Sequence, residues 1–305
     1  MAYRFFTDST VEANVQRILN EQLEKAIQEL SEGIQKTPEQ AIHSTRKRLK
    51  KGRAVLRLVR KSIGEKTYQR ENDQLRSIGQ ALAPARDGAV YQKTLNDLIE
   101  IYGISLENKG LADLQDSLAD LYKSELKALI DRDDAIAPIL ADLKESRARL
   151  SNLTLHQTGW KAVSKSLEQV YRQGRDRFHA AYKDGNDETF HDWRKRVKDL
   201  WYSSCLLKQI WPPVMEVLGS EAHYLSELLG DGHDSAVLQH FLRHHPSEVA
   251  LSDTYLQVLM PLLVHRQDKL HQQAKGLGKK FYSEEPKTFI KRIHSYWRSE
   301  FSGSN

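Results

Sequence analysis

Apolar residues recur at spacings of three and four along most of the chain, and no segment alternates as a half-buried strand does. Prolines fall near the starts and breaks of this pattern, where a helix tolerates them. The sequence therefore predicts an all-α protein. The expected helices lie near residues 10–33, 38–63, 67–83, 86–102, 107–130, 135–150, 157–183, 187–209, 212–229, 232–244, 252–277 and 286–301.

These helices form two series of six, with similar lengths in similar order. HSTRKRLK at 43–50 and HDWRKRVK at 191–198 carry the same pattern, H-x-x-R-K-R-x-K, 148 residues apart. Farther on, LAPARDGAV at 82–90 aligns with LLGDGHDSAV at 228–237, at an offset of 147. One small loop deletion accounts for this change of offset, so the pattern indicates an internal duplication.

The period of the repeat is far too long for a solenoid of short units, so two packed bundles are favoured over an open superhelix. The expected fold is all-α, with one copy of a helical bundle in residues 1–152 and a second in 153–305. With 305 residues, the chain has the length of two domains of ordinary size.

Charge is distributed unevenly along the chain. The sequence contains 46 Lys and Arg against 41 Asp and Glu, a net charge of +5 that admits a polyanionic partner without requiring one. Nine of the cations, and no carboxylate, lie between Glu39 and Glu65. Cations on adjacent turns of a helix repel one another. This segment therefore favours an anionic ligand over an ordinary solvated helix face.

The cations of this segment share one side of the expected helix. At 100° per residue, Ile42, Leu49, Leu56 and Ile63 form a core stripe. The neighbouring arc carries His43, Arg46, Lys47, Lys50, Arg53, Arg57, Arg60 and Lys61. The arc of the second copy carries His191, Arg194, Lys195 and Lys198, followed by Trp201, Tyr202, Cys205 and Lys208.

A mixed row of arginines and lysines suits a ligand with many phosphates. A guanidinium binds two phosphate oxygens at once, while an ammonium supplies a point charge. His43 and His191 occupy matching positions in the two arcs. Each is expected either to donate to a phosphate oxygen or to cap and pack its own helix.

Other motifs do not favour a metal centre or catalysis. GDGHD at 230–234 offers Asp and His as metal ligands, but the other copy has Pro and Arg at the matching positions. Asp87 and Asp234 are common to both copies and are expected to cap helices or to pair with a basic residue. GLGKK at 276–280 lacks the first glycine and the Ser or Thr of a phosphate loop. No nucleophile and base pair is apparent, so neither an enzyme nor a bound cofactor is expected.

The remaining features indicate a cytosolic protein. No window approaches the roughly 18 apolar residues of a membrane span, and the N-terminus lacks the pattern of a secretion signal. Cys205 is the single cysteine, which excludes an internal disulfide. Four tryptophans fall at helical spacings and are expected in the core, namely Trp193, Trp201, Trp211 and Trp297.

HSTRKRLKKGRAVLRL and HDWRKRVKDLWY, each followed by L…RD…V or L…HD…V, together resemble the CHAD family of histidine-containing α-helical domains. The resemblance covers nearly the whole chain. It implies two bundles related by a pseudo-two-fold axis, with basic helices lining a shared cleft or pore. It also implies binding of inorganic polyphosphate without turnover, and the hypothesis extends to docking on polyphosphate granules. The family's basic ligand residues correspond by position to His43, Arg46, Lys47, Lys50, Arg53, Arg57, His191, Arg194, Lys195 and Lys198.

Three other functions remain open from the residues alone. A nucleic-acid binder would use the same phosphate contacts together with stacking groups, for which the basic arcs offer only Trp201 and Tyr202. A scaffold for acidic protein partners would use the cations and tolerate loss of the histidines. An enzyme acting on polyphosphate would need a metal or a general base beside the basic row.

Overall fold

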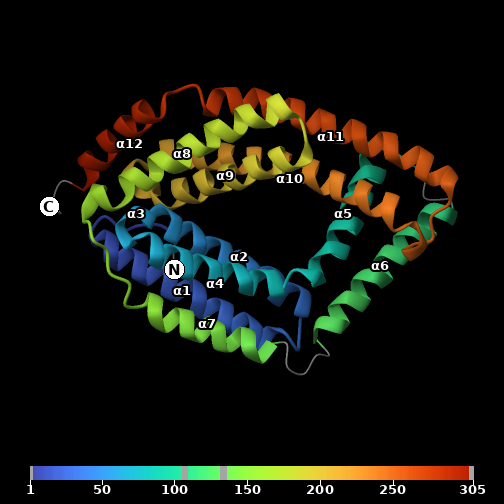
Figure 1. Cartoon of the computed structure of the whole chain (residues 1–305), viewed down its shortest axis with the longest axis horizontal. Coiled ribbons are helices and arrows are strands. Elements are labelled where there is room, and N and C mark those ends of the chain that lie inside the picture. The colour runs from blue at the N-terminus through green and yellow to red at the C-terminus, as the bar shows by residue number, and fades with distance from the viewer. Residues whose placement is uncertain (1–2, 105–108, 131–135, 302–305) are drawn as a thin grey trace.

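The computed structural model consists of helices joined by short turns (Figure 1). It describes residues 3–104, 109–130 and 136–301, and of residues 84–87 and 109 it describes only the backbone. No strand occurs in these ranges, which confirms the all-α prediction. The α-helices are α1 (Val11–Gly33), α2 (Pro38–Leu58), α3 (Arg60–Ile63), α4 (Glu65–Ala81), α5 (Pro84–Tyr102), α6 (Lys109–Ile130), α7 (Ile136–Leu150), α8 (Gly159–Asp184), α9 (Asp187–Leu206), α10 (Pro212–His244), α11 (Asp253–Phe281) and α12 (Pro286–Glu300).

Helix α10 runs unbroken through the GDGHD segment, although two separate helices were expected on either side of that segment. At the matching place in the first half, α4 ends and α5 begins at Pro84, which lacks the amide hydrogen needed inside a helix. Gly230 and Gly232 keep their amides, and a helical glycine costs only about 1 kcal/mol relative to alanine. Both glycines permit close packing, since a Cβ on Gly230 would lie 2.8 Å from the guanidinium of Arg194.

Helices α2 and α9 end in the same way at matching positions. A single helix was expected over 38–63, but α2 stops before Val59 and the short α3 follows. Helix α9 stops before Leu207, and a short 3₁₀ helix follows (Lys208–Ile210). Val59 has φ −105° and ψ 10°, and Leu207 has φ −90° and ψ 11°. The amide of each donates to the carbonyl four residues earlier.

Two hydrophobic clusters hold the helices together. The larger contains residues from both halves of the chain, among them Leu23, Leu56, Leu75, Leu167, Val197 and Ile293. The predicted core stripe, which runs over α2 and α3, is confirmed, because none of its members is more than 3% exposed: Ile42, Leu49, Leu56 and Ile63. This burial fixes which side of α2 is left for its basic residues.

The smaller cluster joins α5 and α6 to α10 and α11, at the right of Figure 1. Its leucines include Leu95, Leu98, Leu114 and Leu118 from the first pair of helices, and Leu238, Leu242, Leu259 and Leu263 from the second. Both clusters therefore draw residues from either side of residue 152. The division at that residue stays a prediction.

The tryptophans are only partly placed as expected. Trp193 and Trp297 are buried, whereas Trp211 is 45% exposed at the start of α10, where its ring meets the edge of Tyr296. The core prediction is wrong for Trp211. Trp201 is partly exposed and stacks against Tyr202. No helix in the described part of the chain is long and apolar enough to cross a membrane.

Candidate anion-binding pocket

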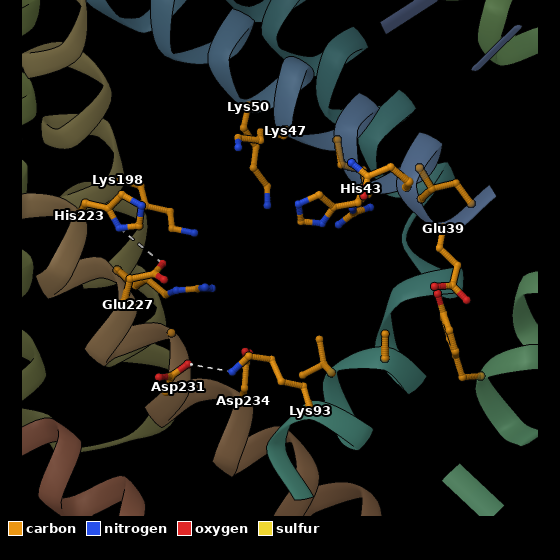
Figure 2. Close-up of a pocket in the computed structure, with 18 of the residues that line it drawn as sticks. Glu39, His43, Lys47, Lys50, Lys93, Lys198, His223, Glu227, Asp231 and Asp234 are labelled. Carbon is orange, nitrogen blue, oxygen red and sulfur yellow. Dashed lines mark ion pairs between the residues drawn. The ribbon is translucent and has the colours of Figure 1, made fainter. Parts of the chain in front are cut away.

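A pocket of about 900 Å³ lies among α2, α5, α9 and α10 (Figure 2). It brings together six of the ten residues that the sequence analysis singled out as ligands: His43, Arg46, Lys47, Lys50, Arg194 and Lys198. Lys93 of α5 adds a further cation that the sequence analysis did not identify. The two matching basic segments, which lie 148 residues apart in the sequence, thus contribute cations to one pocket.

Helix α2 supplies one wall of the pocket. With Ile42 and Leu49 buried, His43, Lys47 and Lys50 lie on the pocket side, as Figure 2 shows. Lys47 forms no ion pair with any residue in the described ranges. The guanidinium of Arg46 donates to the backbone carbonyl of Gly79, near the end of α4. This contact orients the side chain of Arg46.

Helix α9 supplies the neighbouring wall. Trp193 and Val197 are fully buried and face the core, which turns Arg194 and Lys198 toward the pocket. The Nε of Arg194 donates to the carbonyl of Ser226 at 3.4 Å. The contact matches that of Arg46, because the two arginines are 148 residues apart and their carbonyl partners 147 apart. Trp201 and Tyr202 continue this wall.

Helix α10 gives the pocket an acidic side. Glu227, Asp231 and Asp234 line it there, and the Nδ1 of His223 lies 3.7 Å from Oε1 of Glu227. The Nζ of Lys93 lies 3.8 Å from Asp231. Burial raises the pKa of Asp231, although the charges of Lys93 and Arg266 oppose that shift. The pocket therefore carries cations on α2 and α9 and carboxylates opposite them on α10, with one further carboxylate, Glu39, at the start of α2.

His223 and Glu227 were not predicted from the sequence to belong to a site. Together with Asp231 they form a polar stripe at steps of four, a spacing that is visible in the sequence. The sequence does not show which neighbour the stripe faces, because that depends on how α10 packs against α5 and α9.

Two of the expected ligands are used inside the protein instead. The Nε of Arg53 donates to Oδ1 of Asn72 at 3.0 Å, and burial, followed by the charge of Arg57, lowers its pKa. Arg57 forms an ion pair with Asp199 of α9, and NH1 of Arg196 lies 3.1 Å from the other oxygen of that carboxylate. Arg53 and Arg57 therefore tie α2 to its neighbours and do not line the pocket, contrary to expectation.

Two residues of α9 also lie outside the pocket. The Nζ of Lys195 lies 2.9 Å from Oδ1 of Asp192, and the lysine side chain is 50% exposed. His191 stacks on His233 with ring centroids 4.3 Å apart. Burial, followed by the charges of His233 and Lys195, lowers the pKa of His191 to about 4. The imidazole is thus neutral near pH 7.

The two aspartates common to the repeats differ in what can be described. The side chain of Asp87 lies outside the described residues. Asp234 lies inside α10, so the prediction that this residue caps a helix is wrong. Its carboxylate is 3.3 Å from Nδ1 of His233 and faces the pocket, which agrees with the alternative of a basic partner. Among the described residues, no group of three or more His, Cys, Asp or Glu could hold a metal ion.

Comparison with known proteins gives one family and a shared fold. The model of the CHAD domain family matches residues 17–243. The crystal structure of the CHAD domain from the plant Ricinus communis matches with a TM-score of 0.69 and 17% identity, covering 91% of this chain and 94% of that one. PptA from Streptomyces chartreusis matches with a TM-score of 0.57 and 13% identity, covering 90% and 100%. No curated protein matches the sequence.

Proposed function

The chain belongs to the CHAD domain family, and from this premise we propose that its pocket binds inorganic polyphosphate through the cations of α2 and α9. One observation carries the proposal. The same pocket is lined by cations of two helices that are distant in the sequence: Arg46, Lys47 and Lys50 on α2, and Arg194 and Lys198 on α9. Cations held this close repel one another, and a chain of phosphates offers a negative charge to each of them.

We further propose that the fold is a duplication of one bundle around a pseudo-two-fold axis, with the basic cleft between the copies. Two pairs of matching features support it. Arg46 and Arg194 donate to corresponding carbonyls, and Val59 and Leu207 end corresponding helices in nearly the same conformation. The cleft then combines one basic helix from each copy.

In this proposal the protein binds and releases polyphosphate without changing it. We also propose that the protein is cytoplasmic and associates with polyphosphate granules. The test of turnover is release of phosphate. Incubation of the protein with long-chain polyphosphate should leave the chain length unchanged on a gel, with and without added Mg²⁺. Shortening of the polymer that requires the protein would contradict the non-catalytic part of the proposal and leave the binding part intact.

The experiment that tests binding is a competition titration at one fixed salt concentration. Long-chain polyphosphate, triphosphate, ATP, single-stranded RNA and duplex DNA compete for the protein at equal total phosphate. We expect long-chain polyphosphate to bind most tightly. By analogy with nucleic acids, the affinity should fall as salt rises, with a log-log slope of roughly 0.7 to 0.9 per phosphate contact. Tighter binding of RNA or DNA would replace the proposal with a nucleic-acid function.

A further inference from the structure

A second, smaller hollow lies beside the pocket on α2. Its lining residues come from one face of that helix: Gln40, His43, Ser44, Lys47, Arg48 and Lys51. Gln40, His43 and Lys47 line the pocket as well, so the two hollows meet along a ridge of α2 that these three residues form. We call this second hollow the outer groove.

The outer groove has a surplus of positive charge. Burial, followed by the charges of Arg48 and Lys47, lowers the pKa of Lys51, and Lys25 of α1 acts in the same direction. The Nζ of Lys51 lies over the ring of Tyr3, 4.9 Å from its centroid. Among the groove's cations, Arg48 alone has a described carboxylate partner within 4 Å, Glu29.

The charges of the pocket direct a bound polyanion toward this groove. Glu227 and Asp231 line the α10 side, where they repel phosphate, whereas His43, Lys47 and Lys50 lie on the α2 side, together with Glu39 at the start of that helix (Figure 2). A flexible chain of phosphates is therefore held against the cations of α2 and α9, away from the carboxylates of α10. Lys51 is one helical turn beyond Lys47, roughly 6 Å along the axis, so cations continue along the helix where the pocket ends.

We propose that the outer groove is a second subsite for the same phosphate polymer, occupied by the part of a long chain that leaves the pocket over Lys47 and reaches Lys51. This inference rests on the proposed function and adds the direction in which the polymer runs. A chain held in the pocket makes its second contact intramolecularly, at a high effective concentration. Triphosphate is held at the pocket's cations, so it gains little from the groove.

The test compares single neutral substitutions by calorimetric titration with long-chain polyphosphate and with triphosphate. Lys51→Gln should weaken the long chain about threefold to tenfold and leave triphosphate within twofold, since one partly exposed ionic contact is lost. Lys198→Gln, in the pocket, should weaken both ligands. Lys165→Gln, at an exposed position on α8, is the matched control and should change neither. Ser44→Lys adds a cation to the groove and should strengthen the long chain alone.

Lys51→Gln keeps the hydrogen bond from the hydroxyl of Tyr3, because that bond is made to the backbone carbonyl of residue 51 at 3.0 Å. Melting curves followed by circular dichroism verify that each variant is folded. If Lys51→Gln changes neither ligand while Lys198→Gln weakens both, the outer subsite is refuted and the proposed function stands. Equal weakening of both ligands by Lys51→Gln also refutes the subsite. If Lys198→Gln affects neither ligand, the proposed function itself is contradicted.

Discussion

The ion pairs around Asp199 are the part of the α2 and α9 interface with the largest predicted effect on stability. The carboxylate is 6% exposed and has two guanidinium partners, Arg57 of α2 and Arg196 of α9, which are 17% and 21% exposed. Asp199→Asn keeps the shape of the side chain and leaves both positive charges without a carboxylate. Breaking a buried ion pair in this way costs about 3 to 5 kcal/mol.

For a chain of 305 residues, this loss corresponds to a melting temperature lower by roughly 5 to 8 °C, because the entropy of unfolding scales with length. Thermal unfolding followed by circular dichroism measures it. Asp192→Asn is the matched control, since Asp192 lies on the same helix and pairs with the half-exposed Lys195. An exposed pair of this kind contributes about 0 to 1 kcal/mol.

The comparison between the two aspartates decides whether burial is the cause. If Asp199→Asn and Asp192→Asn lower the melting temperature equally, the argument from burial is wrong.

Asp199→Asn should also bind long-chain polyphosphate more weakly, because Arg57 and Asp199 hold together the two helices that carry the pocket's cations. If the Asp199→Asn protein is as stable as the wild type and binds polyphosphate equally well, the Arg57–Asp199 ion pair does not hold the pocket's cations in place.

Three further results are expected. Lys198→Glu should weaken polyphosphate binding at least about tenfold in a calorimetric titration, whereas Lys195→Glu, three residues away on the exposed side, should change it little. Affinity should rise as pH falls, because the raised pKa of Asp231 lets its carboxyl group lose its negative charge at a higher pH than an ordinary aspartate would; Asp231→Asn should remove this part of the rise, and above about pH 5 His191→Gln should not, since the pKa of His191 is about 4. Gly230→Ala should lower affinity in the same titration without unfolding α10, because its methyl group would displace the guanidinium packed 2.8 Å away; unchanged affinity would show that this guanidinium does not bind the ligand.

Much of the helical architecture follows from the spacing of apolar residues. The stripe from Ile42 to Ile63 predicted the buried side of α2, and hence where His43, Lys47 and Lys50 project. These are properties of one helix, set by its own periodicity. The continuity of α10 was missed because glycine pairs are typical of turns, whereas here they make room for side chains from other helices.

The roles of individual cations depend on contacts between distant segments. Arg57 and Lys50 occupy the same basic arc, yet Arg57 meets Asp199, which is 142 residues away in the sequence. Nothing in the local sequence distinguishes a guanidinium that binds a ligand from one that binds a buried carboxylate. Lys93 was missed for the same reason, because its place in the pocket requires α5 to pack against α10.

The small hydrophobic cluster at one end of the molecule has a consequence for biosynthesis. Helix α6 ends at Ile130, but its leucine partners on α11 follow only after Asp253. At roughly 5 to 20 residues per second, a ribosome needs on the order of 10 seconds to add them. During that interval the leucines of α5 and α6 are exposed on the nascent chain, where a chaperone can bind them or another chain can aggregate with them.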